Sequence, residues 1–88
     1  MYIIACLRDD GVPVTGLAPK LYGWEVATGK DVLNDETMTE LGASGIYRYN
    51  FSGYDKDLDY AFLIDAGSSI ANGNERYQFL TQDSLLAY

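Results

Sequence analysis

Carboxylates are the side chains that could carry chemistry, because the 88-residue chain has 13 Asp and Glu, one cysteine and no histidine. Histidine is the commonest general base and a principal ligand of transition metals. Its absence excludes a serine triad, a cysteine-histidine pair and a zinc site of ordinary composition. Two carboxylates suffice for a glycosidase, but no spacing marks two of these acids as a pair. We therefore expect no enzymatic activity and no catalytic residue.

Asp55, Asp57 and Asp59 alternate along one acidic segment, which is the pattern closest to a metal site. Alternating carboxylates in a loop are one way to gather the oxygen ligands of calcium. A helix-loop-helix calcium loop beginning at Asp55 would need glycine where Tyr60 stands and glutamate where Ala66 stands. Because the motif is incomplete, the sequence predicts a protein with no metal and no other cofactor. A looser calcium site in this loop remains an alternative to a solvated acidic turn.

The charge balance argues against two classes of partner. Six Lys and Arg against 13 acids give a formal net charge of -7. This charge repels phosphate backbones and anionic lipid headgroups, so we expect neither nucleic acid nor a membrane as a partner. No stretch approaches the roughly 20 apolar residues of a membrane span. The apolar start, Met1 to Leu7, has no preceding basic residue and is shorter than a signal-peptide core, so we interpret it as a first strand.

The spacing of β-forming residues and turn residues predicts one all-β domain. Apolar residues make up 48% of the chain, which is enough for a packed core. No segment has a sustained 3.6-residue period, so crossover helices are not expected. We predict a single antiparallel sandwich over residues 1–88, with a short apolar C-terminal tail at 84–88. About seven short strands are expected, at 2–8, 12–16, 20–26, 36–41, 46–51, 60–66 and 76–81, and 32–33 is a brief strand or a connection before a turn at 34–35.

Alternation of side chains along the expected strands indicates the core. The clearest period of two lies in residues 46–51, where Tyr47, Tyr49 and Phe51 share one face. In residues 20–26, Trp24 is the expected core anchor. Cys6 is expected to be a small buried side chain rather than a reactive thiol. The full expected core is Trp24, Tyr47, Tyr49, Phe51, Phe62, Ile64, Tyr77 and Phe79.

Two of the expected strands, 2–8 and 60–66, are apolar on both faces. A two-layer sandwich buries only one face of each strand. The second face must then be covered, either by a loop or the tail of the same chain or by a subunit interface. The residues expected to bind a partner are Ile3, Ala5, Leu7, Ala61 and Leu63, together with Leu85, Leu86 and Tyr88 of the tail.

Turn and core signatures of a known class occur in four segments: Val12-Pro13-Val14-Thr15-Gly16-Leu17, Thr39 to Gly42 followed by Gly45 to Phe51, Tyr60 to Gly67, and Arg76-Tyr77. Together they resemble the carboxypeptidase-regulatory-like or transthyretin-like sandwiches found in tailed-bacteriophage virions. The resemblance covers nearly the whole chain, implies an immunoglobulin-like or transthyretin-like sandwich, and brings no catalytic residue with it.

This resemblance implies a structural component of a phage virion, assembled in the host cytoplasm. The expected roles are a capsid decoration or cement protein, or an accessory module of the neck or tail. Its expected partners are other virion proteins, namely capsid, neck or tail subunits, and copies of itself. The alternative function is a cell-surface adhesion or carbohydrate-binding sandwich, which would need Tyr or Trp rings exposed in a row.

Overall fold

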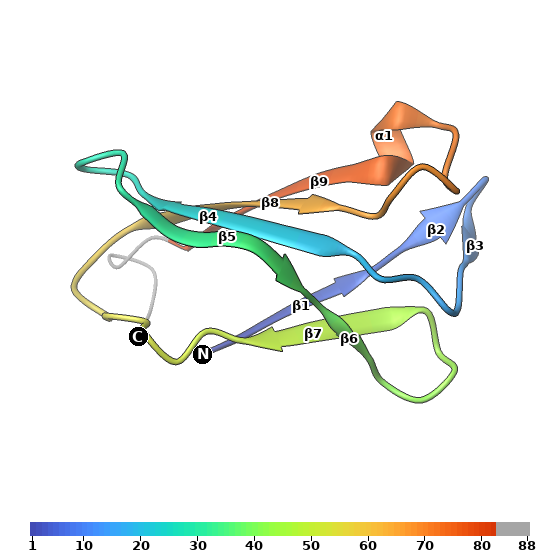
Figure 1. Ribbon diagram of the computed structural model, residues 1–88, viewed down its shortest axis with the longest axis horizontal. Helices are drawn as coiled ribbons and strands as arrows, with labels where there is room; N and C mark the ends of the chain where they lie inside the picture. The colour runs from blue at the N-terminus through green and yellow to red at the C-terminus, as the bar shows by residue number, and fades with distance from the viewer. Residues whose placement is uncertain (83–88) are drawn as a thin grey trace.

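The computed structural model describes residues 1–82. These residues form an antiparallel all-β sandwich of nine strands and one short helix (Figure 1), which confirms the all-β sandwich expected from the sequence. The strands are β1 (Tyr2–Cys6), β2 (Arg8–Asp9), β3 (Val12–Pro13), β4 (Lys20–Glu25), β5 (Asp31–Thr37), β6 (Thr39–Glu40), β7 (Ile46–Asn50), β8 (Tyr60–Asp65) and β9 (Tyr77–Gln82), and the helix is α1 (Gly73–Arg76).

Two sheets face each other with the core between them (Figure 1). A four-stranded sheet in the order β5-β4-β8-β9 is the upper layer of the figure, and a three-stranded sheet in the order β1-β7-β6 is the lower layer. Strands β2 and β3 form a separate hairpin at the end of the molecule where α1 lies. The expected hairpin around the glycine-containing loop at 42–45 is present, with Glu40 of β6 opposite Tyr47 of β7.

The chain crosses between the two sheets where β5 passes into β6. Met38 stands between the two strands, is buried, and donates its amide to the Pro19 carbonyl at 2.9 Å. The sequence predicted a turn at 34–35, but β5 continues through these residues, and its pairing with β4 is irregular there. Asp35 absorbs the irregularity with a φ of 56°, a conformation that Asp adopts more readily than most residues.

The centre of the core is a cluster of aromatic rings. The ring of Phe51 meets those of Tyr60 and Phe62 edge to face, with centroids 5.1 and 5.9 Å apart. Gly23 of β4 lies directly against this cluster, because a Cβ atom there would be 2.9 Å from Cδ1 of Phe62. The absence of a side chain at position 23 therefore allows Phe62 to occupy the interior.

Four of the expected core residues are buried: Tyr47, Phe51, Phe62 and Ile64. Tyr49 is half-buried and packs against the core. The expectation is wrong for Tyr77 and Phe79, which are 43% and 75% exposed, and for Trp24, which is only half-buried. In β4 and β9 the opposite face points inward, carrying Leu21 and Gly23 in β4 and Leu80, opposite Phe62, in β9. Alternation separates the two faces of a strand, but where both are apolar it does not say which one is buried.

The carboxylate of Glu75 ties the β2–β3 hairpin to α1. It accepts the backbone amides of Asp10 at 2.8 Å and Gly11 at 2.9 Å. Asp10 and Gly11 are the two turn residues of the β2–β3 hairpin, and their φ angles are 55° and 82°. Two-residue hairpin turns in which both residues have positive φ fit the twist of the flanking strands. The sequence predicted only a loop at 67–75, whereas the structure ends that loop in the single helical turn that holds Glu75.

A second carboxylate and one tyrosine hold the connection between β3 and β4. Glu40 accepts the amides of Gly16 at 2.9 Å and Gly45 at 3.0 Å, and these hydrogen bonds lower its pKa below the ordinary value. The Tyr47 hydroxyl donates to the Val14 carbonyl at 2.7 Å and accepts the Leu17 amide at 3.1 Å. These contacts fix residues 14–17 against the sandwich.

Candidate functional site

The residues expected to bind a partner fall into three groups. Ile3, Ala5 and Leu7 are 4%, 6% and 0% exposed and belong to the core, so that expectation is wrong for them. The β1 side chains that reach the surface are the alternate ones, Tyr2 at 58% and Ile4 at 54%. Two residues of β8, Ala61 and Leu63, are half-buried and lie on the outward side of the four-stranded sheet. The three tail residues, Leu85, Leu86 and Tyr88, lie outside the described part of the chain.

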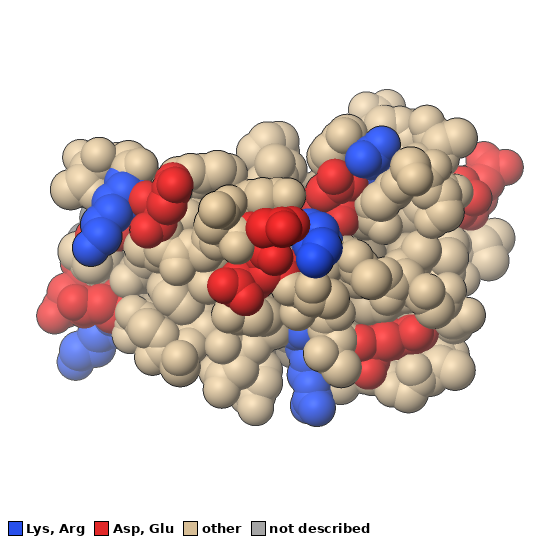
Figure 2. Space-filling model, in the orientation of Figure 1, with Lys and Arg blue, Asp and Glu red and all other residues tan. Residues whose placement is uncertain are grey.

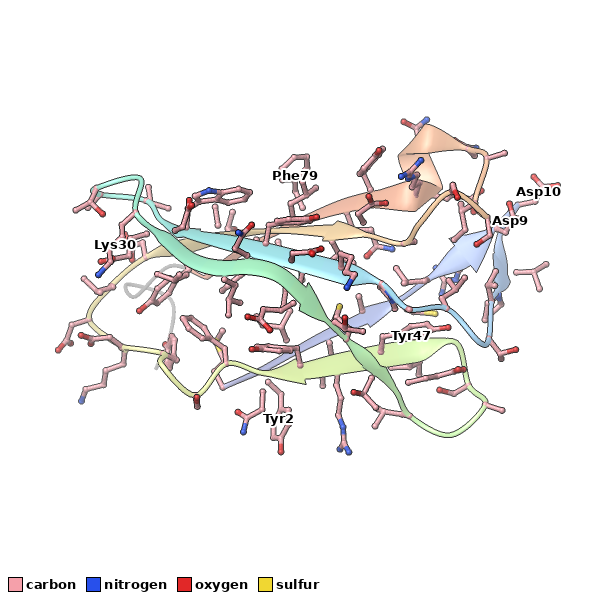
Figure 3. All side chains as sticks on the ribbon, in the orientation of Figure 1. Tyr2, Asp9, Asp10, Lys30, Tyr47 and Phe79 are labelled. Atoms are coloured by element: carbon pink, nitrogen blue, oxygen red, sulfur yellow. The ribbon has the colours of Figure 1, made fainter. Side chains whose placement is uncertain are left out.

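Outward side chains of β4, β8 and β9 form two cross-strand rows, which we call the outer aromatic face. The register aligns Tyr22, Leu63 and Phe79 in one row. It aligns Trp24, Ala61 and Thr81 in the next row. Figure 3 shows the labelled Phe79 pointing away from the sandwich, whereas the labelled Tyr47 points into the space between the layers. The apolar side chains of β8 and β9 are thus divided between the core and this face.

Phe79 makes the outer aromatic face unusual for an isolated domain. Its side chain is 75% exposed and stands opposite Leu63. Burying a side chain of this size stabilises a protein by about 1.5 to 3 kcal/mol, so leaving it in water forgoes most of that stabilisation. Exposed apolar side chains are ordinary when scattered, but aligned neighbours on adjacent strands form a continuous patch, which is typical of an interaction site.

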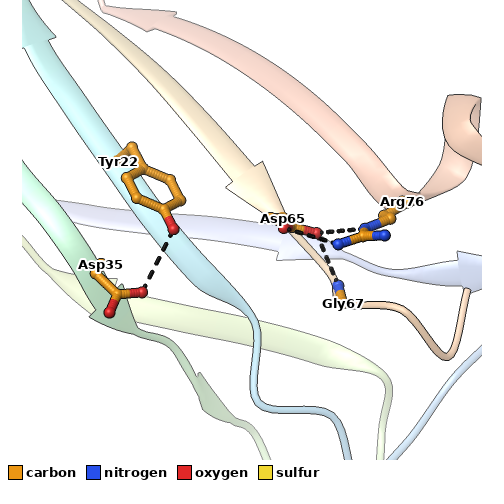
Figure 4. A network of polar contacts seen from close by, with 5 residues as sticks. All are labelled: Tyr22, Asp35, Asp65, Gly67 and Arg76. Carbon is orange, nitrogen blue, oxygen red and sulfur yellow. Dashed lines mark hydrogen bonds and ion pairs between the residues drawn. The ribbon is translucent and has the colours of Figure 1, made fainter.

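Polar groups border the outer aromatic face where β8 and β9 meet the 66–76 connection (Figure 4). Arg76 donates from Nε to Oδ1 of Asp65 at 2.8 Å and from Nη2 to Oδ2 at 3.2 Å. The Gly67 amide also donates to Oδ1, at 2.9 Å. The hydrogen bond from Arg76 is the largest cause of the lowered pKa of Asp65, and the hydrogen bond from Gly67 also lowers it. The guanidinium carbon of Arg76 lies 5.0 Å from the ring centre of Tyr77, which continues the border along β9.

The β5 border is also polar. The Tyr22 hydroxyl donates to Oδ1 of Asp35 at 3.4 Å, and Nζ of Lys20 lies 3.9 Å from the same oxygen. Desolvation, and then the charge of Asp35, raise the pKa of Tyr22. Figure 2 shows acidic and basic groups side by side in the middle of this side of the molecule. An apolar centre with a charged and hydrogen-bonding rim is the usual composition of a protein-protein interface.

The three loop aspartates do not form a metal site with one another. The Asp57 amide donates to Oδ1 of Asp55 at 2.9 Å, and the Asp55 amide donates to the Tyr60 hydroxyl at 3.0 Å. In residues 1–82, no three or more Asp, Glu, Cys or His side chains gather closely enough to hold a metal ion. Asp55 is therefore used in the turn of its own loop.

Cys6 and two carboxylates with lowered pKa values, Glu40 and Asp65, are the remaining side chains with possible reactivity. Cys6 was expected to be buried but is half-buried, beside Arg8 and Gln78 in a hollow of about 240 Å³. Its strand is the sheet edge, which leaves the outward side chain partly exposed. Glu40 and Asp65 both have lowered pKa values, the opposite of what a general acid requires.

No protein-family model, curated protein or solved structure matches this chain. No helix within residues 1–82 is long and apolar enough to cross a membrane.

Proposed function

We propose that this protein is a non-catalytic structural component of a tailed-bacteriophage virion, which binds other virion proteins through its outer aromatic face. The observation that carries the proposal is the exposure of Phe79, 75% of whose side chain is in solvent within an aligned apolar row. The resemblance of residues 12–17, 39–51, 60–67 and 76–77 to phage sandwiches supports the virion setting. The proposed roles are capsid decoration or cement, or an accessory module of the neck or tail, assembled in the host cytoplasm.

The composition of the face favours a protein partner. Its centre has aromatic and aliphatic side chains, and its rim has the Asp65–Arg76 pair, which can exchange hydrogen bonds with a partner. A net charge of -7 disfavours nucleic acid and anionic membranes. The same charge makes copies of the chain repel one another, so contact between copies requires an apolar interface that outweighs the repulsion.

A carbohydrate-binding module is the second candidate, and one observation favours it. Trp24 and Tyr22 lie on the outward side of β4 rather than in the core. A sugar-binding protein would need its aromatic rings on such an outward side. Against it, Leu63 and Phe79 occupy the middle of the face and offer no hydrogen bond to sugar hydroxyls. Acrylamide quenching of Trp24 fluorescence discriminates between the two functions. We expect glycans to leave the quenching unchanged, and protection by a glycan would favour the carbohydrate function.

The virion setting is tested on purified phage particles from the source of the gene. We expect peptides of this chain to sediment with intact particles, in a fixed ratio to the capsid protein, when gradient fractions are measured by mass spectrometry. A structural component occupies a set number of symmetry-related positions, which is the reason for the fixed ratio. The proposal fails if the chain is produced in infected cells but is missing from the particle fractions.

A further inference from the structure

One side of the sandwich has an apolar hollow between β1 and β9. Both are the last strands of their sheets in the described chain. At one end Nε2 of Gln78 donates to the Cys6 carbonyl at 3.0 Å and joins the two strands. Beyond this bridge lies a hollow of about 340 Å³, lined by Ile3, Ile4, Phe62, Leu80 and Thr81 among others.

On the opposite side of the sandwich, the chain itself joins the two sheets. There, β5 runs on into β6 through buried Met38, so one continuous segment of chain joins the two sheets (Figure 1). Between β1 and β9, residues 1–82 provide only the Gln78 bridge, and Ile4 is left 54% exposed at the hollow. Edge strands with exposed apolar side chains invite pairing with another strand.

The chain itself continues at this hollow. Thr81 lines it, and Gln82 is the last residue of β9. The sequence continues Asp83-Ser84-Leu85-Leu86-Ala87-Tyr88. Asp and Ser are turn-forming residues, and the next four are apolar. Four residues of extended chain span about 13 Å, the same length as Met1 to Ile4 along the other wall of the hollow.

We propose that the hollow between β1 and β9 is the docking site of the last apolar residues of the same chain, 85–88. Leu85 and Leu86 would remove Ile4 and Leu80 from water and cover the free edges of both sheets. We favour a segment of the same chain over one from a second copy, because a segment attached at Gln82 is present at a high effective concentration beside Thr81. This proposal does not depend on the outer aromatic face, from which the hollow is separate.

Truncation after Gln82 is the first test. We expect the melting temperature of the truncated chain to fall by about 5 °C or more relative to residues 1–88, because burial of several apolar side chains is lost. Leu86→Asp should act in the same direction. Val12→Asp is the matched control, since Val12 is exposed in the distant β3 and should change the melting temperature little. If truncation leaves the melting temperature unchanged, the proposal is overturned.

A double-mutant cycle tests the contact even where truncation prevents folding. Ile4→Ala and Leu86→Ala should each lower the melting temperature, and the double variant should lose less than the sum of the two, because both remove the same contact. Additive losses would overturn the proposal. The melting temperature of residues 1–88 should not depend on protein concentration, and native mass should show a monomer. A concentration-dependent melting temperature with a dimeric mass would instead place the tail of a second copy in the hollow and would also overturn it.

Discussion

The two faces of the four-stranded sheet are built from the same strands and are both apolar, yet residues 1–82 cover only the inner one. The inner face carries Leu21, Phe62 and Ile64, each no more than 2% exposed. The outer face carries Leu63 and, on the neighbouring strand, Phe79, which is 75% exposed. The sheet therefore has more apolar surface than its own core uses. Exposed apolar surface of this kind is typical of interaction sites, which is why we propose that this face binds a partner.

The first prediction concerns Phe51, which follows β7 and covers the inner face from the opposite sheet. Phe51 is 4% exposed and its ring packs against Tyr60 and Phe62 across the core. We expect Phe51→Ala to lower the free energy of unfolding by about 3 to 5 kcal/mol, a large part of the stability of a small domain. Chemical denaturation measures this, and a variant with the wild-type midpoint would show that the inner face is not the main source of stability.

The second prediction tests how tightly the inner face is packed. In Gly23→Ala the new Cβ would lie 2.9 Å from Cδ1 of Phe62, so the ring or the strand must move. We expect a loss of about 1 to 3 kcal/mol, again from denaturation. Gly73→Ala is the control, because a Cβ there would meet no atom within 4 Å. Equal stability of the two variants would contradict the close packing.

The sequence predicts the all-β fold well because the signal is local. Tyr47, Tyr49 and Phe51 alternate with the polar Arg48 and Asn50, so the inward face of β7 and the residue after it follows from polarity alone. The hairpin before it follows from the glycines at 42 and 45, both of which have positive φ.

The sequence does not predict which face of β1, β4 and β9 is buried. In β9, Tyr77 and Phe79 alternate with Gln78 and Leu80, and the aromatic set has the stronger core signal although it lies outside. The decision depends on register with β8, where Leu80 is opposite buried Phe62, and that pairing is not local. For this reason the sequence predicts only part of the candidate site: it names Ala61 and Leu63 as partner-binding residues but places Trp24 and Phe79 in the core.

The third prediction concerns the rim of the outer face. The folded pKa of Asp65 lies below its ordinary value of 3.8, mainly because of the hydrogen bond from Arg76. A lowered folded pKa means that the stabilisation is complete well above pH 3.8 and is lost as the pH falls through the folded pKa. For a pair this near the surface we expect at most about 1 kcal/mol. Asp65→Asn should reduce the stability at neutral pH and flatten its fall in acid, as measured by denaturation from neutral to acid pH. An unchanged acid dependence would contradict this role of the pair.

Phe79→Asp is the most direct test of the proposed binding role of the outer aromatic face. This variant should unfold within about 0.5 kcal/mol of the wild-type chain, because Phe79 is exposed and adds little to the core. Its incorporation into phage particles, measured by mass spectrometry in competition with the wild-type chain, should nevertheless be lost. Val12→Asp makes the same kind of change at a side chain that is 64% exposed elsewhere, and should be incorporated normally. Equal incorporation of the two folded variants would contradict this binding role.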